Sequence, residues 1–173
     1  MPVAIERGTD GGSNVAEHAK LGDLARVGGS SPRTVHHTDV LTDLEYEKGL
    51  AVEIGVNEMV CGSKRICLGR TIIPPHTANE RHIHANAEAA MYIVRGTMTL
   101  FLGPEAKMVD CRPGTFVYAP EGVVHGVANR SRTEEVELVF AYGGVPSKEA
   151  ARIVFIDDSG SDYPPKGWDD IQG

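Results

Sequence analysis

The chain has 173 residues, a length that suits one domain with a sizeable hydrophobic core. It carries 17 basic and 24 acidic side chains, which gives a formal net charge of −7, and it has no cluster of Lys and Arg. This balance argues against nucleic acid and anionic membrane surfaces as partners. No stretch approaches the roughly 18 consecutive apolar residues of a membrane span, so none is expected.

The N-terminus and the cysteines indicate a cytoplasmic protein. The opening segment, MPVAIER, contains no apolar signal core. Cys61, Cys67 and Cys111 are odd in number and lack the spacing of metal ligands, which is typical of free thiols in a reducing compartment.

Residues 1–34 are predicted to form an N-terminal extension that is partly flexible, because the segment GTDGGSN within it is rich in glycine and polar residues. His36 and His37 follow. Neighbouring residues of a strand face opposite sides, so we interpret this pair as an ordinary edge or loop feature and not as a chelate. Residues 42–45 favour a short helical turn.

From residue 50 onward, the pattern is one of short strands separated by Gly and Pro. We expect strands at 50–56, 64–73, 82–84, 89–94, 97–102, 107–110, 115–119, 123–128, 134–142 and 153–156, with one helical turn at 146–150. Such a series favours an all-β fold, closed as a sandwich or barrel of the double-sheet jelly-roll type. The predicted domain covers 35–156 with a core at 50–145, and residues 157–173 form a C-terminal tail that we interpret as a surface strap.

The run AAMYIV at 89–94 lacks polar alternation. A strand that is apolar on both faces is expected to be covered on both faces. One face would line the interior of the barrel. The other would be covered by N-terminal strands or by a second subunit, and the second possibility motivates the hypothesis of a homodimer.

The segment RHIHANAE contains the clearest chemical signal. His82 and His84 are two residues apart, so on a strand they point the same way with Cα atoms roughly 6.6 Å apart. Two imidazoles can converge on one ion over that span. Glu88 keeps the same parity, and His with a carboxylate suits a divalent transition metal. An ordinary surface His-x-His pair is the alternative.

A third histidine, His125, follows the tight turn Pro120-Glu121-Gly122 in an apolar setting. A single histidine in such a place is more often a core residue than a ligand. It becomes a candidate ligand if its strand lies beside the strand that carries His82 and His84.

These two segments resemble the two conserved motifs of the cupins. The second motif is a Gly, five residues, Pro, one residue, Gly, two residues, His, three residues and Asn, and it is matched by Gly114, Pro120, Gly122, His125 and Asn129. The first motif is similar to the segment containing His82, His84, Glu88 and Gly96. Two departures occur: His76 stands at the leading Gly position, and seven residues instead of six separate Glu88 from Gly96.

The resemblance implies a double-stranded β-helix barrel of the cupin type, and cupins of this compact kind are usually dimeric. It also implies one divalent transition metal per chain, such as Fe, Mn, Ni or Zn. By position in the motifs, His82, His84, Glu88 and His125 would be its ligands.

Strand parity adds further candidates around such a site. Tyr92 shares the face of Glu88 and could donate a hydrogen bond to an oxyanion, although a core aromatic residue is an equal interpretation. His76 lies at the rim, where it could shuttle protons or be an ordinary loop histidine. Phe116 and Tyr118 share one face of their strand and are expected to line the pocket.

Three classes of function remain open. The first is an oxidoreductase, dioxygenase-like, that acts on a small organic substrate chelating the metal. The second is a non-redox isomerase, cyclase or lyase at a Lewis-acid metal. The third is a non-catalytic small-molecule binder. We place an enzyme before a binder, and the dioxygenase before the non-redox enzyme.

Overall fold

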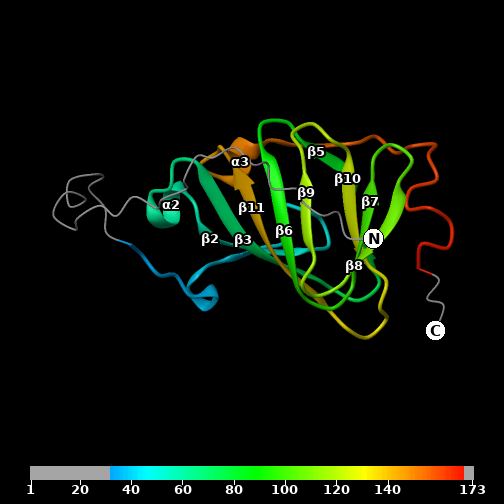
Figure 1. Cartoon of the computed structure of the whole chain (residues 1–173), viewed down its shortest axis with the longest axis horizontal. Helices are drawn as coiled ribbons and strands as arrows, with labels where there is room; N and C mark the ends of the chain where they lie inside the picture. The colour runs from blue at the N-terminus through cyan, green and yellow to red at the C-terminus, as the bar shows by residue number, and fades with distance from the viewer. Residues whose placement is uncertain (1–31, 170–173) are drawn as a thin grey trace, which may run out of the picture. The chain divides into compact units, whose positions relative to one another are not determined.

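The computed structural model of the chain describes residues 32–169, and strands dominate that part (Figure 1). The predicted extension at 1–34 therefore lies outside the described residues except for its last three positions, and its flexibility stays a prediction. The helices of the described part fall far short of the length and apolar character that a membrane span requires.

Two antiparallel sheets make up the fold. The first sheet has the order β1-β2-β3-β11-β6-β9. Its strands are β1 (Thr42–Asp43), β2 (Ala51–Val56), β3 (Ile66–Ile73), β6 (Glu88–Arg95), β9 (Phe116–Ala119) and β11 (Val136–Gly143). The second sheet has the order β12-β5-β10-β7-β8, with β4 paired to β10. Its strands are β4 (Thr77–Ala78), β5 (His82–His84), β7 (Met98–Leu102), β8 (Lys107–Cys111), β10 (His125–Asn129) and β12 (Ile153–Phe155). This all-β architecture confirms the predicted jelly-roll class.

The core is built by strands that alternate buried and partly exposed side chains. In β11, Val136, Leu138, Phe140 and Tyr142 are buried, while the residues between them are partly exposed. This strand lies between β3 and β6, and its alternation directs one row of side chains into the interior. Burial of such apolar side chains stabilises the domain by about 1.5–3 kcal/mol each.

Small elements differ from the sequence prediction. Residues 42–45 do not open a helix, because Thr42 and Asp43 pair with Glu53 and Val52 of β2 as strand β1. The short helix α2 (Glu58–Cys61) was not predicted; its first turn is capped by the Asn57 side chain, which accepts a hydrogen bond from Val60 N at 2.7 Å. The predicted turn at 146–150 is helix α3 (Lys148–Ala151).

The predicted cover on both faces of β6 is only half present in the described chain. Ala89 and Ile93 are buried in the interior, whereas Tyr92 and Val94 are 39% and 44% exposed on the outer face. The N-terminal strands do not lie over that face, since β1 and β2 extend the sheet at the edge of β3. A covering second subunit stays a hypothesis.

The tail beyond β12 packs against the second sheet. Its Tyr163 hydroxyl donates a hydrogen bond to the carbonyl oxygen of Asn79 at 2.8 Å, and its ring lies 5.1 Å from that of Phe101. Arg81, buried to 5% exposure, forms an ion pair with Asp158 and lies over the Tyr163 ring. Asp158 and Tyr163 of the tail are therefore fixed to Asn79 and Arg81, just before β5.

Two glycines give a matched test of the packing between strands. A Cβ at Gly69 in β3 would lie 2.5 Å from the Glu53 carbonyl oxygen and 2.6 Å from the Phe140 ring, whereas a Cβ at Gly55 would meet nothing within 4 Å. We expect Gly69→Ala to lower the free energy of unfolding by about 1–3 kcal/mol, because the added methyl group overpacks the strand. Gly55→Ala should change it by less than about 0.5 kcal/mol. Urea unfolding measures both, and equal effects would contradict this account.

Candidate metal centre

Three histidines are brought together by two neighbouring strands of the second sheet. His82 and His84 lie on β5 with Ile83 between them, and both side chains are buried because alternate residues share a face. His125 is the first residue of β10, and its Cα partner across the strands is His82. The pairing of β5 with β10 therefore supplies the third imidazole.

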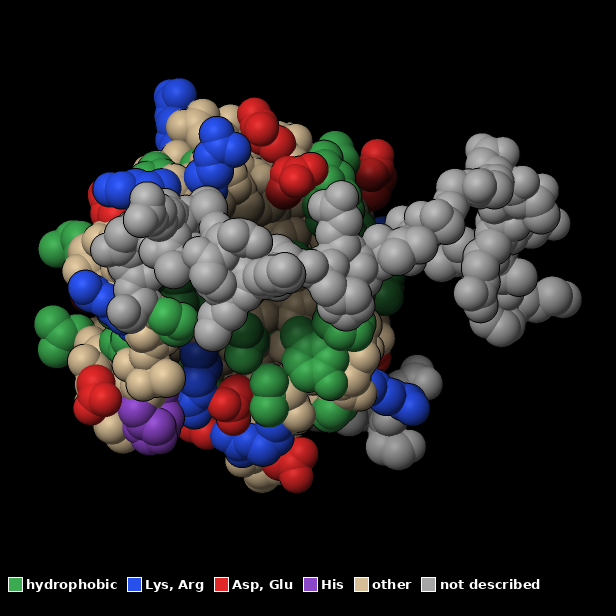
Figure 2. All heavy atoms as spheres, turned by 60° about the vertical axis from the view of Figure 1, so that its left-hand side comes forward, with side chains coloured by type: hydrophobic (Ala, Val, Ile, Leu, Met, Phe, Trp, Pro, Cys, Tyr) green, Lys and Arg blue, Asp and Glu red, His purple; other side chains and the backbone are tan. Residues whose placement is uncertain are grey.

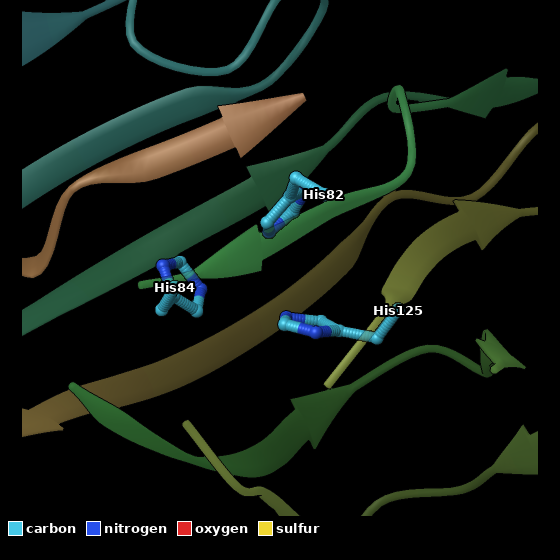
Figure 3. Close-up of side chains that lie close together, drawn as sticks. All are labelled: His82, His84 and His125. Carbon is cyan, nitrogen blue, oxygen red and sulfur yellow. The ribbon is translucent and has the colours of Figure 1, made fainter. Parts of the chain in front are cut away.

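The three rings point toward one common space (Figure 3). The ring centroids of His82 and His125 are 4.6 Å apart, those of His82 and His84 are 5.0 Å apart, and those of His84 and His125 are 5.2 Å apart. One ligand nitrogen from each ring lies within 4.8 Å of the others, an arrangement that could hold a metal ion. Across residues 32–169, no other three His, Cys, Asp or Glu side chains form such a group.

Backbone carbonyls fix the orientation of two of the rings. His82 Nδ1 lies 3.0 Å from the carbonyl oxygen of Glu80, and His125 Nδ1 lies 2.9 Å from that of Val123. A carbonyl oxygen only accepts, so Nδ1 carries the proton in both rings. The Nε2 lone pair is then left free to bind a metal, as in histidine ligands held by an acceptor on their other nitrogen.

Two buried nitrogens of the group have no hydrogen-bond partner: His84 Nδ1 and His125 Nε2. An unsatisfied buried polar group costs about 1–3 kcal/mol. A bound ion would satisfy a nitrogen lone pair without requiring a proton. The residues present therefore fit a divalent transition metal.

The three imidazoles are neutral at physiological pH. Burial, with the neighbouring histidines adding to it, lowers the pKa of His84 to about 3. Burial lowers the pKa of His125 to about 4 and also lowers that of His82. The neutral form is the one that binds metals, since protonation would occupy the nitrogen lone pair.

The histidines open into a narrow cavity of about 30 Å³ between the two sheets. That space holds an ion or a water molecule but not a large organic group. Apolar side chains form most of its wall, and the polar side chains besides the histidines are Glu47, Thr71, Asn79 and Tyr142. The Tyr142 ring lies 4.5 Å from that of His84.

Glu88 is not brought together with the three histidines. It is the first residue of β6, it is exposed, and its carboxylate accepts a hydrogen bond from the Tyr118 hydroxyl. The parity argument fails because β5 and β6 belong to different sheets, so the intervening turn at residues 85–87 does not preserve strand alternation. Ala89 occupies the inward position beside the cavity.

The side chains of the predicted pocket residues also face outward. Tyr92 lies on the outer face of β6, where its ring is 4.8 Å from that of Phe116. Phe116 is 82% exposed and Tyr118 is 60% exposed, so neither lines the cavity described here. Their inward neighbours on the sheet, such as Met91, take that position.

His76 lies apart from the cavity. Its backbone N–H donates to the Ser131 carbonyl oxygen at 2.8 Å, and its ring stacks on Trp168 at 5.5 Å. Its Nε2 lies 3.8 Å from an Asp169 carboxylate oxygen. These contacts join His76 to the tail.

The four polar wall residues besides the histidines, Glu47, Thr71, Asn79 and Tyr142, were missed by sequence reasoning. Tyr142 could have been found, because it continues the inward row of Leu138 and Phe140 along β11. Glu47 could not, because it lies in the irregular segment between β1 and β2, where no strand periodicity shows which way a side chain points.

A family model described as a cupin domain matches residues 69–142, a stretch that contains all three histidines. Solved structures that resemble the chain share the same double-sheet fold. Residues 69–142 are therefore a cupin domain. No curated protein matches the sequence.

Three solved structures illustrate the cupin resemblance. The polyketide cyclase RemF from Streptomyces resistomycificus is 20% identical with a TM-score of 0.61, over 78% of this chain and 93% of that one. An uncharacterized protein with a double-stranded β-helix domain from Klebsiella pneumoniae is 14% identical with a TM-score of 0.56, over 73% of this chain and 99% of that one. Oxalate decarboxylase from Bacillus subtilis, described with Mn(II) centres, is 19% identical with a TM-score of 0.61, over 75% of this chain but only 34% of that one. These identities establish a shared fold.

The depressed pKa values predict that the metal-free cupin loses stability in acid. Between the folded pKa values, about 3 for His84 and about 4 for His125, and the usual value of about 6.5, the unfolded chain binds more protons than the folded one. The free energy of unfolding should therefore fall as the pH decreases from about 6.5 toward 4. Urea unfolding of the metal-free protein measures it, and His84→Gln should reduce the slope. A slope unchanged by that substitution would contradict the prediction.

Proposed function

We propose that this cupin is a metal-dependent enzyme in which His82, His84 and His125 hold one divalent transition metal. Fe, Mn, Ni and Zn all suit imidazole ligands. A small organic molecule would be the substrate. The observation that carries the proposal is the convergence of three buried imidazoles, two of which have a buried nitrogen with no hydrogen-bond partner among the described residues.

Such an ion supplies Lewis-acid polarisation of a bound oxygen or sulfur group and, if it is redox-active, an electron path to O₂. Three neutral protein ligands would leave positions on such an ion for a chelating substrate and for O₂. This donor set favours a dioxygenase-like reaction as the first candidate.

One observation favours a second candidate, a non-redox isomerase, cyclase or lyase. The carboxyl group of Glu47 lies in the wall of the same cavity. Reactions of this class move protons, and a carboxylate near the reacting group is a common proton carrier. The fold shared with a polyketide cyclase is compatible with this class.

The metal proposal predicts which substitutions abolish metal binding. Wild-type protein purified gently and supplied with Fe, Mn, Ni or Zn should contain about one metal per chain, and His125→Ala less than about 0.2, since a structured site of this kind binds tightly. Glu88→Gln should bind metal as the wild type does, because Glu88 faces outward. Elemental analysis measures the content.

Circular dichroism checks that each variant is folded, and His82→Asn serves as a second ligand variant. A wild type that takes up none of the four metals would disprove the metal proposal. Loss of metal in Glu88→Gln would restore Glu88 as a ligand.

Metal replacement separates the classes of function. O₂ consumption in step with loss of an aromatic, keto or thiol substrate, by the iron form and not the zinc form, would support the dioxygenase. Turnover by the zinc form without O₂ would support the non-redox enzyme. Ligand binding without turnover by any metal form would support the non-catalytic binder.

We also propose a homodimer, formed through an aromatic face defined by Tyr92, Val94, Phe116 and Tyr118. These side chains lie exposed on the outer side of β6 and β9, where Tyr92 pairs with Phe116. A contiguous exposed apolar patch is typical of an interaction site, and self-complementary patches form two-fold dimers. On the face in Figure 2, hydrophobic side chains lie among acidic and basic ones. The three free cysteines support a cytoplasmic location.

Substitution on the aromatic face tests the dimer. Phe116→Glu should convert the protein from a dimer to a monomer, because a charge at the centre of an apolar interface is not solvated there. Leu41→Glu, at another exposed position, should leave the dimer intact. Light scattering at micromolar concentration measures the mass, and a monomeric wild type would disprove the proposal.

A further inference from the structure

Glu47 is a carboxylate that reaches the cavity from outside the barrel strands. It lies between β1 and β2, where its backbone carbonyl oxygen accepts a hydrogen bond from Leu50 N at 2.9 Å. Its side chain lines the cavity together with the three histidines. The two cupin motifs begin only after residue 75, so they assign Glu47 no role in the proposed metal site.

A chain of buried hydrogen bonds holds this carboxylate in place. Asn79 Nδ2 donates to Glu47 Oε2 at 2.6 Å. The amide oxygen of Asn79 accepts from Val127 N at 2.7 Å, which fixes the amide orientation, since a backbone N–H can only donate. Asn79 itself is 3% exposed. Glu47 is therefore positioned relative to β10, the strand that begins with His125.

Glu47 is close to the histidines without being one of their group. It is not part of the set whose ligand atoms lie within 4.8 Å of one another. It is near enough for its charge and that of His125 to influence each other. One carboxylate oxygen bonds to Asn79, and the other accepts no hydrogen bond from the described residues. That leaves one oxygen for a molecule bound between Glu47 and the ion.

The surroundings make this carboxylate more basic than one in water. Burial raises the pKa of Glu47, while the Asn79 hydrogen bond opposes that increase. A buried carboxyl group with a raised pKa accepts and returns a proton more readily than a carboxyl group in water.

We propose that Glu47 is the acid–base residue of this site, and this inference rests on the proposed metal-dependent function. The substrate is a weak acid with an enol, phenol or thiol group, or a C–H beside a carbonyl. As its conjugate base binds the ion, the O–H, S–H or C–H bond breaks and the electron pair stays on the substrate. The proton goes to the free oxygen of Glu47 and returns to the product.

Azide is a suitable probe because it is a small anion that needs no turnover. When azide binds at the ion, Glu47 should take up one proton from the solvent. A substrate would bring that proton itself. The titratable groups that share the cavity or interact with Glu47 are His82, His84, His125, Tyr46 and Tyr142. The histidines are held by the metal, and burial raises the pKa of both tyrosines above the range of the experiment.

The experiment is an azide titration of the cobalt(II)-loaded protein, followed by visible absorbance between about pH 5.5 and 7.5. Wild-type affinity should weaken as the pH rises, by up to about tenfold per pH unit, the limiting slope for one coupled proton. Glu47→Gln keeps the Asn79 hydrogen bond but cannot take a proton, so its affinity should weaken less than about threefold per unit. Glu45→Gln is the matched control, an exposed residue of the same segment, and should behave as the wild type.

Each outcome decides the inference. Equal slopes in wild type and Glu47→Gln would overturn it, because ionisation of ordinary metal-bound water is common to both proteins. Cobalt binding without azide binding would also overturn it, since Glu47 would then face no open position. Failure of the wild type to bind cobalt would instead refute the proposed metal site, and elemental analysis of the same samples separates that result from the others.

Discussion

The site depends on removal of the three imidazoles from water. Once His82, His84 and His125 are buried, the charged form of each is disfavoured, and the neutral rings need acceptors or an ion for their nitrogens. Two of the rings use the same local device, a hydrogen bond from Nδ1 to the carbonyl oxygen two residues earlier in the chain. This hydrogen bond lets the local backbone fix the orientation of each ring. The strands that bury the histidines therefore also orient their side chains.

The two sheets divide the work of building the cavity. The second sheet provides the histidines through β5 and β10, and the first provides the apolar wall through β6 and β11. The apolar side chains of that wall lower the effective dielectric constant, which strengthens charge interactions inside. Glu47 brings a carboxylate into that environment from the segment between β1 and β2. The acidic group of the cavity therefore comes from a different part of the chain than the histidines.

Much of the fold, and the shared face of His82 and His84, could be predicted from the sequence. Strand alternation located β2, β3 and β11 closely, because period-two burial leaves a direct trace in residue type. His82 and His84 were paired correctly because they lie on one uninterrupted strand. Alternation could not be extended from His84 to Glu88, Tyr92 or, on the neighbouring strand, Phe116, because the chain changes sheets between them. The role of an irregular segment such as that of Glu47 depends on tertiary packing alone.

Asn79 makes parts of the chain that are remote in sequence into one structural unit. Its hydrogen bonds reach Glu47 before the barrel, Val127 in β10 and Tyr163 in the tail. Tyr163 approaches so closely that a Cβ at Gly126 would lie 2.5 Å from its hydroxyl oxygen. Local opening of the tail would thus free the Asn79 backbone beside the anchor of the Glu47 carboxylate. Through this one asparagine, the tail therefore supports the position of a carboxylate in the cavity.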